Sequence, residues 1–129
     1  MTQHYVGTKI IEAWPAQKDG ADGYSVKYAD GYTSWAPKDV FEAAYLPLGH
    51  IAHLPPHVQR LVAELEQLGD RISKLGKFQG TDIYASLPED ERKDLDTQGK
   101  CMVAYWNALL SRVERARGQI ERPVTGGDA

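Results

Sequence analysis

The chain has 129 residues and a mass of 14.4 kDa, the size of one domain or of one domain with a small appendage. Its 15 basic and 18 acidic side chains give a net charge of −3, which argues against a general nucleic-acid-binding protein. No long apolar run and no cationic leader followed by an apolar stretch are present, so we expect neither membrane insertion nor secretion. The single cysteine, Cys101, fits a reducing cytoplasm, and we expect it to be a small buried thiol.

Residues 1–46 are typical of a small three-stranded antiparallel β module. The first strand is expected over residues 5–14, and a turn-rich stretch over 16–23 follows it. The second strand shows strict alternation of polar and apolar residues, which places one set of side chains on a common face: Tyr24, Val26 and Tyr28.

The third strand is expected over residues 32–35, directly after Asp30-Gly31. This pair predicts a type I′ hairpin turn, because both of its positions tolerate a positive φ. A short helix is expected over 38–44, with Val40 and Phe41 in contact with the sheet. The aromatic side chains of the sheet form either the core beneath this helix or a stacking surface: Tyr24, Tyr28, Tyr32 and Trp35.

A proline-rich linker, residues 47–56, separates the β module from a helical hairpin expected over 57–117. In the hairpin, apolar residues recur at steps of three and four, which is the stripe of an amphipathic helix. The stripe of the first helix comprises Val58, Leu61, Val62, Leu65, Leu68, Ile72 and Leu75. That of the second comprises Leu95, Met102, Tyr105, Trp106, Leu109, Val113 and Ala116.

Local sequence features predict further details of the hairpin and of the segment that follows it. Gly69 predicts the close approach of another backbone or of a ligand, and Ser86 with Glu89 predicts a capping box at the second helix. A flexible tail is expected over 118–129. Two antiparallel helices cover only one side of each other, so the expected fold is α+β: an N-terminal antiparallel β-meander and a long two-helix hairpin, assembled as a homo-oligomer.

No catalytic motif and no nucleotide-binding loop stand out in the sequence. His50, His53 and His57 have metal-like spacing, but prolines interrupt the segment and no cysteine accompanies them, so linker or cap histidines compete with a zinc site. The acidic run over 89–96 is interpreted as the solvated start of a helix rather than as a catalytic carboxylate pair. We therefore expect no enzyme activity, no cofactor and no bound metal.

The candidate ligand residues lie in the hairpin. Phe78 follows Lys77 beside a polar tip, where the ring either stacks on a purine or closes the tip by hydrophobic contact. Residues 104–122 contain four arginines against two glutamates. This basic patch is either a solvated helix end or a site for a small anion, since arginine can bind phosphate through two donors.

Both halves of the chain resemble known phage proteins. The segments YVGTKII (5–11) and GYSVKYADGYTSWAPKDVFE (23–42) look like a small β module that occurs in several proteins that counter Thoeris defence. The second half is similar to the helical hairpin shared by two phage cyclic-nucleotide sponges, the first type of Thoeris anti-defence protein and the related anti-CBASS sponge. The residues that carry this similarity are PHVQR (56–60), KLGKF (74–78), LPEDE (87–91), Met102, Tyr105, Leu109 and Arg112.

The best overall match is the Thoeris anti-defence sponge. The resemblance implies a homohexamer, built as a trimer of dimers, in the cytoplasm of an infected bacterial host. It also implies binding of glyco-cyclic ADP-ribose isomers without cleavage, and in some members of cyclic trinucleotides at a separate site. With the composition, it implies no DNA partner and no membrane partner.

In that family an aromatic residue at the hairpin tip and arginines on the last helix bind the ADP-ribose ring. The resemblance assigns these roles to Phe78 and Arg112. Arg115 takes the place of a second arginine, because Ala108 and Ala116 occupy the positions one turn before and after Arg112.

The resemblance adds Lys77 for a phosphate and Asp82 for a ribose hydroxyl or an adenine amine. His57 and Arg60 line a second, cyclic oligonucleotide site or simply cap the first helix. The expected function is a phage sponge that sequesters cyclic nucleotide immune signals, cyclic di- and trinucleotides included, and inhibits Thoeris and CBASS. The alternative is a structural or regulatory phage protein that acts through protein–protein contacts of its hairpin.

Overall fold

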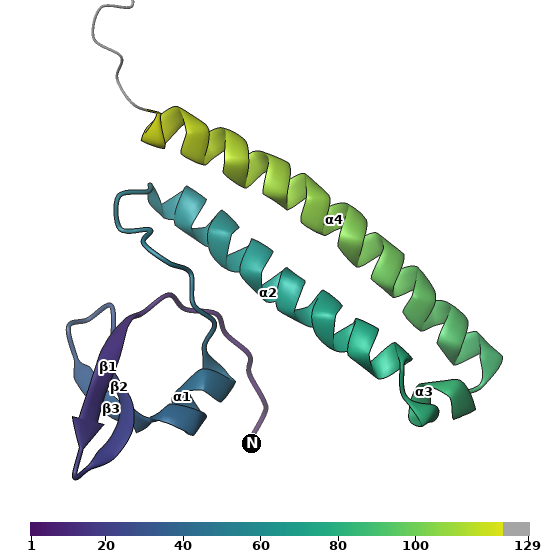
Figure 1. Cartoon of the computed structure of the whole chain (residues 1–129), viewed down its shortest axis with the longest axis horizontal. Helices are drawn as coiled ribbons and strands as arrows, with labels where there is room; N and C mark the ends of the chain where they lie inside the picture. The colour runs from purple at the N-terminus through teal and green to yellow at the C-terminus, as the bar shows by residue number, and fades with distance from the viewer. Residues whose placement is uncertain (123–129) are drawn as a thin grey trace, which may run out of the picture. The chain divides into compact units, whose positions relative to one another are not determined.

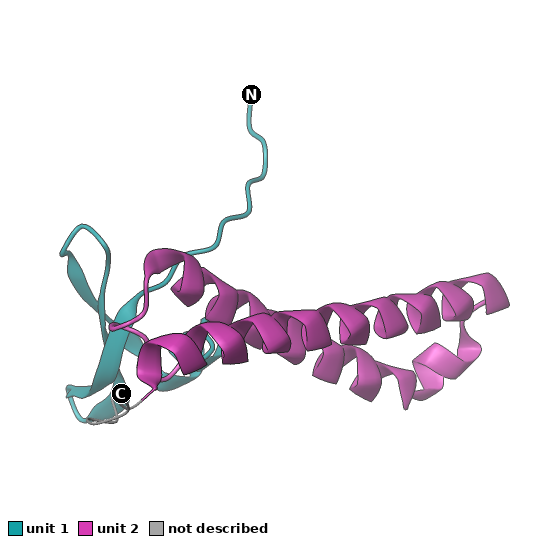
Figure 2. Cartoon of the chain, turned by 90° about the horizontal axis from the view of Figure 1, so that it is seen from above, with its two compact units in different colours: residues 1–46 teal, residues 47–129 magenta. Residues whose placement is uncertain are grey.

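The computed structural model describes residues 1–122, in two compact units that are considered separately. The first unit comprises Met1–Leu46 and the second begins at Pro47 (Figure 2). The first contains a three-stranded antiparallel sheet and the second contains long helices, so the predicted α+β class is confirmed. None of the helices within these 122 residues combines the length and the apolar character needed to cross a membrane.

The sheet of the first unit has the strand order β1-β2-β3, with every neighbouring pair antiparallel. Its elements are β1 (Glu12–Lys18), β2 (Ala21–Lys27), β3 (Thr33–Pro37) and the short helix α1 (Lys38–Ala44). The predicted first strand over 5–14 begins seven residues too early, because Glu12 pairs with Lys27, the last residue of β2. Residues 5–11 run past that end and have no strand to pair with.

The type I′ turn lies at a different pair from the predicted one. Asp19 and Gly20 have φ values of 52° and 80° and join β1 to β2 as a two-residue loop, the geometry of that turn. In the predicted pair only Gly31 has a positive φ, and the Asp30 side chain accepts a hydrogen bond from the Tyr32 N–H at 2.9 Å. That longer turn is therefore stabilised by the aspartate side chain.

The aromatic residues of the sheet divide between its two faces. Tyr24 stacks on Phe41 of α1 at a centroid distance of 4.2 Å, and Val26 on the same face is only 2% exposed. Trp35 lies on the opposite face, against Gly23, so the expectation of one aromatic core beneath α1 is wrong for Trp35. The predicted contact of Val40 with the sheet is also wrong, because this side chain is 61% exposed.

The second unit is an antiparallel hairpin of α2 (Pro56–Gln79) and α4 (Glu89–Glu121), joined through the short helix α3 (Asp82–Ser86) (Figure 1). We call the end that carries α3 the tip and the opposite end the base. The buried helix side chains concentrate in the base half: Val58, Val62, Ala63, Leu65, Leu68, Leu109 and Val113. Toward the tip, Ile72 and Leu75 are only half-buried, so the hairpin's own core covers one half of its length.

Three details of the hairpin differ from the expectations. The Ser86 hydroxyl donates to the Ile83 carbonyl, and Pro88 precedes α4 with no side-chain cap, so no capping box forms. Cys101 is exposed, so the expectation of a buried thiol is wrong. The helix α4 continues to Glu121 beyond the predicted start of the tail, whose residues 123–129 lie outside the described part of the chain.

Two glycines of α2 give a matched test of this packing. A Cβ atom at Gly76 would meet no atom within 4 Å, whereas at Gly69 it would lie 3.1 Å from Nε1 of Trp106. The prediction of a close backbone or ligand at Gly69 is therefore wrong, because the neighbour is the indole ring of Trp106 on α4. Alanine favours a helix by about 1 kcal/mol over glycine, so Gly76→Ala should raise the free energy of unfolding by roughly that amount. Gly69→Ala should raise the free energy of unfolding by less than Gly76→Ala does. Equal increases for the two variants in urea denaturation would contradict the close Trp106 contact.

Candidate ligand-binding surfaces

The antiparallel register places the predicted ligand residues at opposite ends of the hairpin. Near the tip, the Gln79 amide donates to Asp96, and toward the base the Tyr105 hydroxyl donates to Glu64. Phe78 therefore lies beside Asp96, sixteen residues of α4 before Arg112, which corresponds to about 24 Å.

Within one chain, the structure does not bring the two halves of the predicted ADP-ribose site together. Lys77 and Asp82 lie with Phe78 at the tip, whereas Arg115 lies with Arg112 toward the base. His57 and Arg60, assigned to a second site, are in the first turns of α2 and thus at the base as well.

The tip is closed by a small polar and aromatic cluster. Phe78 is half-buried and packs edge-to-face against Tyr84, with ring centroids 6.1 Å apart and an angle of 79°. The Tyr84 hydroxyl donates to Asp96, and the same carboxylate oxygen accepts from the Gln79 amide at 3.1 Å. The bond to Asp96 raises the pKa of Tyr84. The Phe78 ring thus already makes the hydrophobic contact that the sequence offered as an alternative to ligand stacking.

Arg92 is a tip residue that the sequence reading did not single out. Asp96 raises the pKa of Tyr84, and the positive charge of Arg92 partly opposes that rise. The Nε atom of Arg92 is inaccessible to solvent and has no hydrogen-bond partner among residues 1–122. The only sequence signal was its position four residues before Asp96, a spacing too common to be informative.

Toward the base, one surface combines side chains from both helices. The Tyr105 hydroxyl of α4 donates to the Glu64 carboxylate of α2, and this bond raises the pKa of Tyr105. Arg112 lies two turns further along α4, and its positive charge acts to lower the pKa of Tyr105 against the larger effect of Glu64. Arg60, one turn before Glu64, and Arg115 are exposed as well. None of these three arginines forms an ion pair within the described residues.

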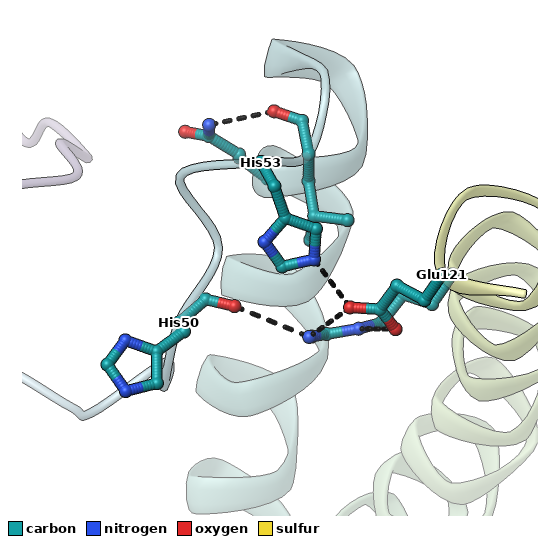
Figure 3. A network of polar contacts seen from close by, with 6 residues as sticks. His50, His53 and Glu121 are labelled. Carbon is teal, nitrogen blue, oxygen red and sulfur yellow. Dashed lines mark hydrogen bonds and ion pairs between the residues drawn. The ribbon is translucent and has the colours of Figure 1, made fainter. Parts of the chain in front are cut away.

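A second polar network at the base fastens the linker to the end of α4 (Figure 3). Glu121 accepts two hydrogen bonds from the Arg117 guanidinium, each at 3.1 Å, and lies 2.5 Å from Nε2 of His53. Arg117 also donates to the His50 carbonyl at 3.4 Å. The arginine first, and the histidine second, lower the pKa of Glu121 to about 2. The four residues form a clasp, which explains why α4 continues to Glu121.

The clasp gives a pH-dependent contribution to stability. Because the pKa of Glu121 falls from 4.5 to about 2 on folding, its stabilising effect is complete above about pH 4.5 and is lost as the pH falls toward 2. Glu121→Gln should therefore lower the unfolding free energy more at about pH 5.5 than at about pH 2.5 in urea titrations. Glu114→Gln, at an exposed position with no ion pair in the described chain, is the control. A deficit of equal size at both pH values would contradict the assignment.

The histidine cluster takes part in the clasp. His53 contacts Glu121 through its ring, whereas His50 contributes its carbonyl oxygen. In the part of the chain that the structure describes, no group of three histidine, cysteine, aspartate or glutamate side chains is placed to hold a metal ion.

A groove of about 560 Å³ lies between α2 and α4 in the tip half. Its lining residues are Ile72, Leu75, Gly76, Gln79, Asp96, Gly99, Lys100 and Val103. The side chain of Val103 is 45% exposed there, so apolar surface stays open to solvent in one chain. None of the residues assigned to ligand binding from the sequence lines this groove.

Comparison with known proteins finds one similarity, and it lies in the hairpin. Residues 55–115 match the family model described as Sequestin, over somewhat less than half of the chain. No curated protein and no solved structure matches the chain. The matched segment contains Phe78, Tyr105 and Arg112 and ends at Arg115, before the clasp residues of α4. The name of this family suggests sequestration of a ligand, and the similarity is consistent with a sponge.

Proposed function

We propose that this protein is a phage sponge, active in the cytoplasm of an infected bacterium, that binds cyclic nucleotide immune signals and leaves them intact. The main ligands are glyco-cyclic ADP-ribose isomers, so the protein inhibits Thoeris, and binding of cyclic di- or trinucleotides extends the inhibition to CBASS. The observation that carries the proposal is the Sequestin similarity of residues 55–115, the segment that contains Arg112 and Arg115, which form no ion pair with any described residue.

The chemistry of the base suits a phosphate-containing ligand. Arg112 and Arg115 are exposed and form no ion pair within residues 1–122, so their donors are available to an anion. A guanidinium can bind a phosphate through two parallel N–H donors. The rest of the chain is net acidic, which disfavours a long polyanion and leaves a small anionic ligand as the better fit.

The separation of Phe78 from Arg112 implies that one ligand cannot contact both residues in a single chain. A site that uses both requires two hairpins, with the tip of one beside the base of the other. The open apolar surface of the tip half, Val103 included, gives such an assembly a hydrophobic contribution. We therefore propose a homo-oligomer, a hexamer built from dimers, with Lys77 and Asp82 on the tip side of the site and His57 and Arg60 at a second site.

Native mass spectrometry tests binding and assembly together. A sponge must act below the concentration that activates its target, which requires nanomolar affinity, about −12 kcal/mol. After incubation with a panel of glyco-cyclic ADP-ribose isomers and cyclic oligonucleotides, the oligomer should retain at least one glyco-cyclic ADP-ribose isomer through buffer exchange. A monomer that retains no member of the panel would contradict the proposal and favour a structural or regulatory protein.

A further inference from the structure

Tyr105 is the aromatic residue that the structure places beside Arg112 within one chain. The two residues are seven positions apart on α4, so they share a helix face at a spacing of about 10 Å. Two residues lie between them on this side of the helix: Leu109 is buried, and Ala108 is exposed and carries only a methyl group. The bond to Glu64 raises the pKa of Tyr105, and the charge of Arg112 acts against that rise, in agreement with the proximity of the two side chains.

The Tyr105 ring is both accessible and held in place. Tyr105 is 48% exposed. The hydroxyl donates to Glu64 of the other helix, which fixes the direction of the ring across the hairpin. A fixed, exposed ring loses little conformational entropy on binding a planar group, so it is a preorganised stacking surface.

Phe78 lacks both properties. It is half-buried, and the edge of its ring packs against Tyr84 in the same chain. Of these two aromatic residues, Tyr105 is therefore the one with an exposed ring beside Arg112, which forms no ion pair within residues 1–122.

We infer that Tyr105 is a further ligand-binding residue, whose ring stacks on the nucleobase of a bound nucleotide while Arg112 of the same chain binds a phosphate. Glu64 is a positioning residue that orients the ring through the tyrosine hydroxyl. The inference rests on the proposed function and assigns its adenine contact to a residue outside the predicted set. In a site built from two chains, the nucleobase lies against Tyr105 whether or not Phe78 of a second copy also contacts it.

The test is calorimetric titration of the full chain with the glyco-cyclic ADP-ribose isomer that the wild type binds. Tyr105→Ala should weaken binding about tenfold or more, since stacking of a base on an aromatic side chain has an effect of this size. Tyr105→Phe keeps the ring and should lose only a few-fold. Tyr32→Ala, which removes another exposed tyrosine from the first unit, is the control and should bind as the wild type does.

A spectroscopic readout separates stacking from a purely structural effect. The adenine absorption band of the bound ligand should show hypochromism with the wild type and Tyr105→Phe, and not with Tyr105→Ala. Glu64→Gln and Tyr105→Phe should each weaken binding, and the double variant should be no weaker than the poorer single one, because both remove the same bond.

Each result decides the inference. Wild-type affinity and hypochromism in Tyr105→Ala would overturn it and leave the proposed function standing. Independent, additive effects of Glu64→Gln and Tyr105→Phe would overturn the positioning role of Glu64. Failure of the wild type to bind any isomer would overturn the proposed function, and the inference with it.

Discussion

Arg112→Ala should weaken binding of glyco-cyclic ADP-ribose by between about tenfold and 150-fold, the largest single effect that we expect on affinity. A hydrogen bond to a charged group contributes about 1.5–3 kcal/mol, and here both partners are charged. Within the described residues Arg112 forms no ion pair, so its removal leaves no buried carboxylate unpaired and should leave the fold intact. The measurement is the dissociation constant by calorimetry.

Two matched variants make the Arg112 result interpretable. Arg112→Lys keeps the charge but loses the planar pair of donors, and should recover only part of the affinity. Arg122→Ala removes a different arginine at the same end of the chain, just beyond α4, and should bind as the wild type does. Equal losses in Arg112→Ala and Arg122→Ala would show that only the overall charge of the base matters.

Leu109→Ala should produce the largest loss of stability, about 2–5 kcal/mol. This leucine is 1% exposed and lies in the base half, where the buried side chains of α2 and α4 concentrate. A cavity at that position cannot be filled by solvent or by a flexible neighbour without moving a helix. The measurement is the free energy of unfolding from urea denaturation, followed by the helical circular dichroism signal.

Leu75→Ala is the companion variant, because Leu75 lies in the tip half and is only half-buried in one chain. Leu75→Ala should lower the free energy of unfolding by less than Leu109→Ala does if the chain unfolds as a monomer. A cost that matches Leu109→Ala and depends on protein concentration would show that another copy covers the tip half. A small cost for Leu109→Ala itself would contradict the core described above.

The long helices could be predicted closely from the sequence, because the apolar period depends on the local chain alone. The proline at 56 and the stripe from Val58 onward placed the first helix almost where α2 lies. Strands were harder to place, since a strand ends where its partner ends: residues 5–11 have a strand-like composition but pair with no described strand. Asp19-Gly20 and Asp30-Gly31 are equivalent as sequences, and only the strand register distinguishes them.

The candidate site depended on long-range geometry that local patterns do not contain. The distance between Phe78 and Arg112 follows from the register of two antiparallel helices, which no motif specifies. The clasp joins His53 to Glu121 across 68 positions, and the Tyr105–Glu64 bond spans 41. Residue types alone could therefore suggest an anion as the ligand but could not show which aromatic side chain lies next to which arginine.

Recovery of the ligand after heat release tests the central claim most directly. The protein is incubated with glyco-cyclic ADP-ribose, washed free of unbound ligand and heat-denatured, and the supernatant is analysed by mass spectrometry and applied to the Thoeris effector. We predict recovery of the cyclic molecule with its full mass and full ability to activate the effector. A linearised product would show an enzyme, and an empty supernatant would show a protein that does not retain this signal at all.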